Sequence, residues 1–176
     1  MNGKFLCPVI ILLLCNSLKG QINSNTYTKE KIDSIVSKTD IVLEKKQRTF
    51  DLTLYRDYIA KKTYTQKWTY LRDPKNLLYF RVNYTLDSTD YEEEYYLHEG
   101  TLIFATEKEV WRFPSMNPVD SMGWSGVFYF SKGKLIYQST LGHGKSELDN
   151  WDPEKEIWMR HSKRRYNRPE LLKWSK

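Results

Sequence analysis

The stretches EYYLHEGTLIF (Glu94–Phe104) and VFYFSKGKLIY (Val127–Tyr137) repeat one pattern of aromatic, apolar and polar residues. Each places two aromatic residues and an apolar one before two polar residues, then a glycine, one polar residue, Leu-Ile and an aromatic residue. Glycine readily takes the positive φ of a tight turn, so the pattern predicts hairpins that turn at Glu99–Gly100 and at Lys132–Gly133. Because a solenoid needs at least about three repeats, two copies indicate successive hairpins of one antiparallel sheet.

The same pattern predicts a register across each hairpin. Residues at equal distances from the turn should face one another on one side of the sheet, and such cross-strand pairs contribute roughly 0.2–1 kcal/mol each. The expected pairs are Leu97 with Leu102, Tyr95 with Phe104, Phe130 with Leu135 and Phe128 with Tyr137.

The segments before the hairpins predict a helix and further strands. Thr28–Lys46 has apolar residues at helical spacing with charges between them, and Thr28 suits the N-cap. From Thr49 onward the period changes to two, most clearly in Phe80–Leu86, and aromatic and β-branched residues become frequent. The sequence DPKN (Asp73–Asn76) carries turn chemistry between two such runs.

The chain is expected to end in helix. Asp152 can cap its start, Pro153 fits the first helical position, and Pro169 indicates a break before a short last turn. Phe113–Gly123, which is rich in Pro, Ser and Gly, is expected to be an exposed loop. The predicted fold class is therefore α+β: an N-terminal helix packed on an antiparallel β-meander of six to eight strands, with a C-terminal helical segment.

The first residues predict export. Lys4 precedes an apolar run, Phe5–Cys15, and small and polar residues follow, which is typical of a secretory signal peptide over residues 1–20. The run is too short to span a bilayer. A lipoprotein anchored at Cys15 is the alternative, but leucines rather than a small residue precede this cysteine.

Cleavage would leave a cysteine-free mature chain, because Cys7 and Cys15 are the two cysteines of the sequence. Residues 21–176 are then expected to form a single domain. A secreted domain without disulfides is typical of bacteria, so we expect a secreted or periplasmic location.

Charge is unevenly distributed along the chain. Residues 21–150 carry 18 basic and 18 acidic residues, whereas the C-terminal segment, residues 151–176, carries 8 basic and 4 acidic residues. A basic helical segment can associate with an anionic membrane surface or polymer. Export argues against nucleic acid as a partner.

Few motifs in the sequence point to chemistry. LGHGKS (Leu141–Ser146) is similar to the end of a phosphate-binding P-loop, but that motif needs a glycine where Ser139 stands. The three histidines are scattered and predict no metal site. No nucleophile elbow occurs, and neither a catalytic residue nor a cofactor is predicted. The enzymatic alternative is a hydrolase that uses Glu92 and Glu94, which would share one strand face.

Aromatic residues are the most prominent feature, with six tryptophans and thirteen tyrosines. Aromatic residues favour strands and cores, but a row of them can also form a platform for a sugar or a peptide. Aromatic residues near the hairpins and arginines of the basic segment make up the candidate binding residues. They are Trp111, Trp124, Tyr96, Tyr129, Trp158, Arg160, Arg164 and Arg165.

The leader, the helix with IDSIV (Ile32–Val36) and the two hairpins resemble small uncharacterised secreted proteins of Bacteroidetes, which carry "YYF-x-x-GKLIF-x-x-EKE" in the corresponding region. Leu97, His98 and Thr101 depart from that pattern. The resemblance implies export and a hairpin architecture, and it brings no activity.

Together these features favour an exported cell-envelope protein that acts as a non-enzymatic binding module for a protein or glycan. The alternatives are the strand-carboxylate hydrolase and membrane-surface association through the basic C-terminal segment.

Overall fold

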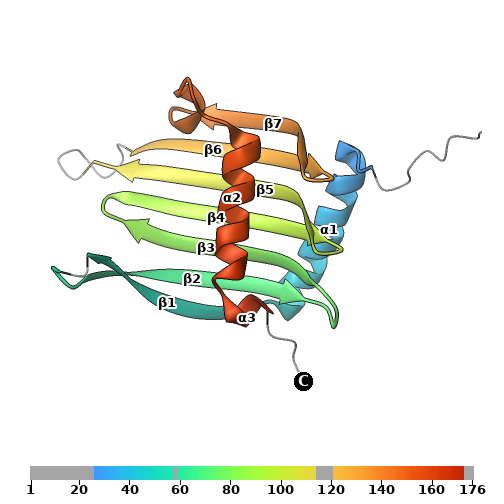
Figure 1. Ribbon diagram of the computed structural model, residues 1–176, viewed down its shortest axis with the longest axis horizontal. Helices are drawn as coiled ribbons and strands as arrows, with labels where there is room; N and C mark the ends of the chain where they lie inside the picture. Colours follow the sequence, from blue (N-terminus) through green and yellow to red (C-terminus); the bar gives the residue numbers. More distant parts are fainter. Residues whose placement is uncertain (1–25, 58, 114–120, 173–176) are drawn as a thin grey trace, which may run out of the picture.

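A single seven-stranded antiparallel sheet with a helix on each face forms the body of the computed structural model, which describes residues 26–57, 59–113 and 121–172 (Figure 1). The strands follow one another across the sheet in chain order, and each pairs with its neighbours in sequence. This confirms the predicted α+β meander. The elements are α1 (Lys29–Lys46), β1 (Arg48–Asp57), β2 (Lys62–Arg72), β3 (Leu77–Leu86), β4 (Thr89–His98), β5 (Thr101–Arg112), β6 (Ser121–Ser131), β7 (Lys134–Gly142), a 3₁₀ turn (Lys145–Glu147), α2 (Pro153–Tyr166) and α3 (Pro169–Leu172).

Helix α1 begins where the sequence predicts. The Thr28 side chain accepts a hydrogen bond from the Lys31 N–H, and the helix runs without a break to Lys46. Basic residues in its last turn suit the negative end of the helix dipole. None of the helices in the described part of the chain is long and apolar enough to cross a membrane. The predicted leader lies outside the described residues.

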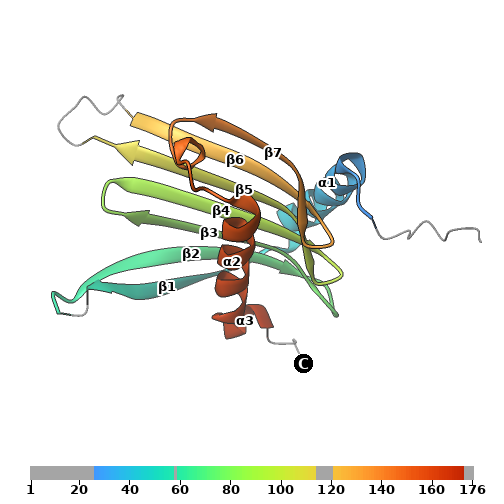
Figure 2. The same ribbon diagram turned by 45° about the horizontal axis from the view of Figure 1, so that its top comes forward.

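The sheet separates two cores because successive side chains of a strand point to opposite faces. On one face α2 crosses the strands, while α1 packs on the other (Figures 1 and 2). The buried residues of the α2 face include Trp68, Phe80, Val82, Tyr95, Leu97, Trp124, Phe128, Phe130, Ile157 and Leu171. Those of the α1 face are Ile32, Leu71, Tyr79, Tyr96, Ile103, Phe104 and Tyr129.

Both hairpin turns have the backbone conformation that the sequence predicts. Gly100 and Gly133 have φ values of 77° and 76°. The residues before them, Glu99 and Lys132, also have positive φ, at 51° and 53°. Two consecutive positive φ values are typical of type I′ turns, whose twist matches that of the flanking strands.

The predicted register is correct next to each turn and wrong one pair further out. Leu97 faces Leu102 and Phe130 faces Leu135, as expected. Beyond them, however, β5 and β7 each carry one extra residue. The pairs are therefore Tyr96 with Phe104, Tyr95 with Ala105, Tyr129 with Tyr137 and Phe128 with Gln138.

A β-bulge explains this shift. Ile103 is the unpaired residue in the first hairpin and Ile136 the unpaired residue in the second, so the two copies share the irregularity as well as the turn. The bulge moves Phe104 to the α1 face, where it packs against Tyr96 and Tyr129.

The C-terminal elements also follow the expected signals. The Asp152 side chain accepts a hydrogen bond from the Lys155 N–H at 3.1 Å, and Pro153 opens α2. After the break before Pro169, α3 buries Leu171 against the sheet. The loop expected over Phe113–Gly123 falls largely on residues 114–120, which lie outside the described residues, and its last three residues belong to β6.

Candidate functional site

Three glutamates lie buried beneath α2. Glu93 of β4 shares a strand face with the core residue Tyr95, and Glu107 and Glu109 of β5 share the face of Ala105. The register places Glu93 directly opposite Glu107. Unpaired carboxylates at such buried positions would be costly, so each requires a cation or hydrogen-bond donor.

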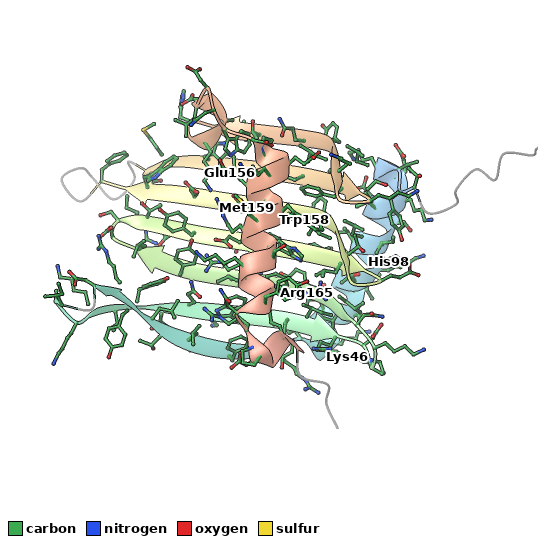
Figure 3. The ribbon with its side chains drawn as sticks, viewed as in Figure 1. Lys46, His98, Glu156, Trp158, Met159 and Arg165 are labelled. Carbon is green, nitrogen blue, oxygen red and sulfur yellow. The ribbon has the colours of Figure 1, made fainter. Side chains whose placement is uncertain are left out.

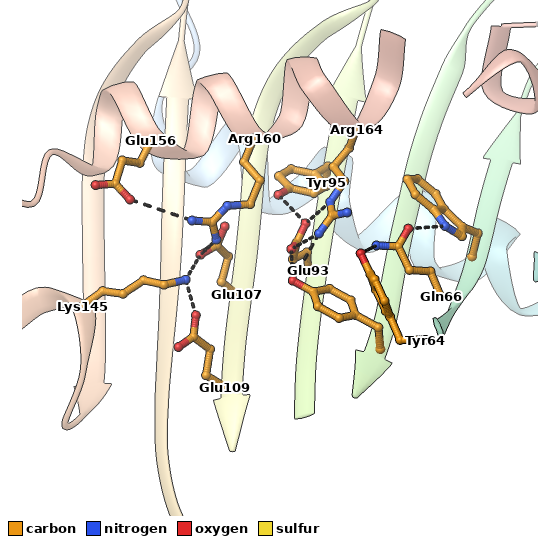
Figure 4. A network of polar contacts seen from close by, with 12 residues as sticks. Tyr64, Gln66, Glu93, Tyr95, Glu107, Glu109, Lys145, Glu156, Arg160 and Arg164 are labelled. Carbon is orange, nitrogen blue, oxygen red and sulfur yellow. Dashed lines mark hydrogen bonds and ion pairs between the residues drawn. The ribbon is translucent and has the colours of Figure 1, made fainter. Parts of the chain in front are cut away.

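Arg164 provides the partner for Glu93. Its Nη2 lies 2.7 Å from Glu93 Oε1 and its Nε lies 2.8 Å from Oε2, which is the two-point geometry preferred by arginine and carboxylate (Figure 4). The hydroxyls of Tyr84 and Tyr95 donate to the same carboxylate, each at 3.1 Å. Burial opposes ionisation of Glu93, but Arg164 and the donors outweigh it and hold the pKa of this carboxyl below its usual value.

Arg160 and Lys145 bind the other two glutamates. Arg160 Nη1 lies 2.7 Å and Lys145 Nζ lies 3.1 Å from Glu107 Oε2, and Lys145 also contacts Glu109 (Figure 4). Burial is the main influence on Glu107 and raises the pKa of its carboxyl despite both cations. Lys145 is the lysine of the LGHGKS stretch, and its ammonium neutralises these internal carboxylates.

A groove of about 990 Å³ runs along one side of α2. Leucine and tyrosine side chains of β1–β4 form its floor. Met159 and otherwise polar or charged side chains of α2 and the residues after it form its wall. The floor residues are Leu54, Tyr64, Tyr84, Leu86 and Tyr91. The lining also includes Glu93, Glu109 and Lys145 from the charged network, and Glu156, Met159, Arg160, Lys163, Arg164, Asn167 and Arg168.

The tyrosines of the floor pack against one another. The rings of Tyr84 and Tyr91 are stacked, with centroids 4.8 Å apart and planes 11° apart. The ring centroid of Tyr64 lies 5.8 Å from that of Tyr84. The Arg164 guanidinium lies over the Tyr84 ring, 5.2 Å from its centroid. Gln66, which donates to the Tyr64 hydroxyl and accepts from the Trp68 indole, extends this polar network beneath the floor (Figure 4).

The structure brings only some of the predicted binding residues to the groove. Arg160 and Arg164 line it. Trp158 lies on the side of α2 away from Met159 (Figure 3), and Arg165 donates to the Gly100 carbonyl at 2.8 Å. The arginines at positions 160, 164 and 165 are thus used in contacts with the sheet, although a helix in a basic segment would be expected to keep them in solvent.

The other four aromatic candidates lie elsewhere. Trp124 is buried in the α2-face core with its indole N–H donating to Ser146 Oγ, and Trp111 packs half-buried against that core. Tyr96 and Tyr129 belong to the opposite face, where their hydroxyls donate to Asp40 and Asp33 of α1. Four residues divided between two faces of a sheet do not form one platform.

The acids of the hydrolase hypothesis also lie away from the groove. Glu92 and Glu94 share one strand face, as predicted. That face is the α1 face, where Glu94 accepts from the hydroxyls of Tyr79 and Thr106. Glu92 lines a second hollow of about 450 Å³ there, with Asp90 and Lys108. Within residues 26–57, 59–113 and 121–172, no group of three His, Cys, Asp or Glu side chains is arranged to hold a metal ion.

Several residues of the groove and network escaped the sequence interpretation, chiefly Glu107 and Glu109, and Lys145 was considered only as part of an incomplete phosphate-binding loop. The segment Ala105–Val110 reads ATEKEV and contains a usable signal, because period two places both glutamates on the face of Ala105. The partners of Glu107 on α2 and on the turn after β7 are 53 and 38 residues away in sequence, so no local pattern connects them.

Comparison with models of protein families, with curated proteins and with solved structures finds no match to this chain.

Proposed function

We propose that this protein is an exported, non-enzymatic binding module of the cell envelope, and that the groove beside α2 binds its protein or glycan ligand. The observation that carries the proposal is the groove itself, about 990 Å³ in volume, with a tyrosine and leucine floor and a charged wall. Ligand sites commonly combine such an apolar surface with a few placed polar groups. The composition of residues 1–20 supports export.

The state of the charged groups favours binding over catalysis. Arg164 holds Glu93 ionised, so this carboxyl is a poor proton donor. Glu107 has a raised pKa, but it is buried and does not line the groove. Glu109 lines the groove and is paired with Lys145. The wall therefore offers fixed charges for recognition.

Two methionines allow a matched test of the groove. Met159, on the groove wall, and Met122, on β6 outside the groove, have similar exposures of 51% and 45%. Met159→Trp should obstruct the groove beside α2, whereas Met122→Trp should leave it unchanged. The ligand panel is chitohexaose, cellohexaose, oligogalacturonate and a displayed library of random 12-residue peptides.

We expect one of these classes to bind the wild type and Met122→Trp alike, to bind Met159→Trp at least about tenfold more weakly, and to be recovered chemically unchanged. Equal binding by Met159→Trp would contradict the site, and a cleaved ligand would contradict the non-enzymatic role.

A second candidate function is association with a membrane surface through α2. Trp158 and Tyr166 are exposed on this helix, and aromatic side chains beside lysines are typical of interfacial segments. Sedimentation with anionic phosphatidylglycerol vesicles tests it. Binding that is absent, or that 500 mM NaCl leaves unchanged, would rule out this electrostatic association.

A further inference from the structure

We infer that the ligand of the groove is an acidic peptide segment of a partner protein, with its carboxylates at Lys163 and Arg168 and its aliphatic side chains on Leu54, Leu86 and Met159. The inference rests on the proposed function and names the class of ligand. It follows from the charges left uncompensated in the groove, from the packing of the tyrosines and from the apolar lining.

The uncompensated charges are at the α3 end of the groove. Of its five cations, Lys145, Arg160 and Arg164 are paired with the buried glutamates. Lys163 and Arg168 form no ion pair with a carboxylate of the described residues. Arg168 Nη1 donates to the neighbouring carbonyl of Asn167, and its guanidinium lies over the Trp68 ring, 5.2 Å from the centroid. Two cations that form no ion pair within the described residues, at one end of a groove, favour a ligand with carboxylates at that end.

The tyrosine packing favours a peptide over a sugar. A sugar ring binds to a tyrosine by stacking on an open ring face. The central ring, Tyr84, has Tyr91 stacked against it at 4.8 Å and the Arg164 guanidinium over it at 5.2 Å, so neighbours occupy its faces. The Tyr84 hydroxyl is also bonded to Glu93 and Arg164, so this residue leaves mainly its ring edge for a ligand, which suits aliphatic side chains.

The rest of the lining also suits a peptide. Leu54, Leu86 and the exposed Met159 provide aliphatic contacts, and methionine adapts to side chains of different shapes. The side-chain amide of Asn167 has both donors and an acceptor, as a peptide backbone requires. The groove thus has apolar contacts along its floor and cationic contacts at one end.

The first test is a selection of the displayed 12-residue library on the immobilised full chain. We expect the enriched peptides to contain Asp and Glu at least about twice as often as the starting library, together with Leu, Ile or Val. Enrichment should disappear on Met159→Trp and persist on Met122→Trp. Enrichment of uncharged or basic peptides, or none at all, would overturn the inference.

The second test measures the most enriched peptide, synthesised with fluorescein, by fluorescence anisotropy. Lys163→Glu should weaken its binding about five- to tenfold, since it replaces an attraction by a repulsion. Lys155→Glu makes the same change on an α2 residue outside the groove and should alter Kd less than twofold. Equal effects of the two variants would contradict a direct role for Lys163.

The outcomes separate the inference from the proposed function. If an oligosaccharide binds and Met159→Trp abolishes its binding, the groove is a ligand site but the peptide assignment is wrong. If enriched peptides are acidic but bind Met159→Trp and wild type equally, the groove is not their site and both proposals fail. Matching thermal unfolding midpoints of the four variants confirm that they remain folded.

Discussion

At the scale of single residues, His161 shows how strongly the α2 interface excludes water. Its ring is buried beside Phe80, Tyr95 and Trp158, and neither ring nitrogen has a hydrogen-bond partner among the described residues. Burial, assisted by the charge of Arg165, lowers the pKa of His161 to about 4. The imidazole is therefore neutral in the folded protein at neutral pH.

This burial predicts a loss of stability in mild acid. An unfolded histidine has a pKa of about 6.5, so below that pH the unfolded chain takes up a proton that the folded protein binds only near pH 4. The free energy of unfolding should fall by about 2 kcal/mol between pH 7 and pH 5 from this group alone. His161→Phe keeps an aromatic ring and should remove that part of the pH dependence. Urea unfolding at both pH values measures the free energy of unfolding. An equal fall between pH 7 and pH 5 in the variant and the wild type would refute the assignment.

The pair of Glu93 and Arg164 makes the second residue-scale prediction. Glu93→Gln leaves the Arg164 guanidinium partly buried without its counter-charge, and breaking a buried ion pair in this way costs about 3–5 kcal/mol. Glu92→Gln is the matched control, because the adjacent residue points to the opposite face and should change stability by less than about 0.5 kcal/mol. Chemical denaturation of both variants compares them. Similar losses would contradict the importance of the pair.

At the scale of elements, the hairpin turns couple backbone conformation to stability. Gly133 has a φ of 76°, and no atom of the described residues lies within 4 Å of an added Cβ, so Gly133→Ala tests conformational strain alone. We expect a loss of about 1 kcal/mol. Lys132, also at positive φ, should be improved by Asn, so Lys132→Asn is expected to gain about 0.5 kcal/mol. Thermal unfolding distinguishes the expected loss of stability in Gly133→Ala from the expected gain in Lys132→Asn. A gain in stability from Gly133→Ala would refute the strain argument.

The sequence was most informative about the individual helices, strands and turns. Period-two alternation, the Gly turns and the caps at Thr28 and Asp152 depend on neighbours within a few residues, and the structure confirms them. The bulges at Ile103 and Ile136 were not predicted, because pairing outward from a turn assumes equal numbers of residues on both strands.

At the scale of the whole molecule, the sheet keeps two cores apart. Ile32 of α1 belongs to one cluster and Ile157 of α2 to the other, with no shared side-chain environment. Ile32→Val and Ile157→Val should each cost about 1 kcal/mol. The double variant should lose the sum within about 0.5 kcal/mol, since separated sites add. Urea unfolding of the three variants tests this. A clear excess or deficit would reveal coupling through the sheet.

Whole-molecule arrangement also decided the candidate site, and here the sequence was a poor guide. Arg160 and Arg164 were predicted as binding residues and do line the groove, yet they also pair with Glu107 and Glu93 beneath the helix. Glu107 was not anticipated at all, and Lys145 was considered only as part of an incomplete phosphate-binding loop. Their significance comes from contacts between segments far apart in the chain, which no spacing rule contains.

The sequence by itself determined the class of the fold, the order of its elements and its tight turns, because periodicity, capping and turn chemistry act between near neighbours. Only the tertiary structure decided which residues meet. It divided the aromatic side chains between two faces and brought the α2 arginines onto buried glutamates. It also left Lys163 and Arg168 beside the groove without an ion pair to a carboxylate of the described residues. The physical reason is that burial and charge pairing depend on the distances between elements, which are established only when the helices pack on the sheet.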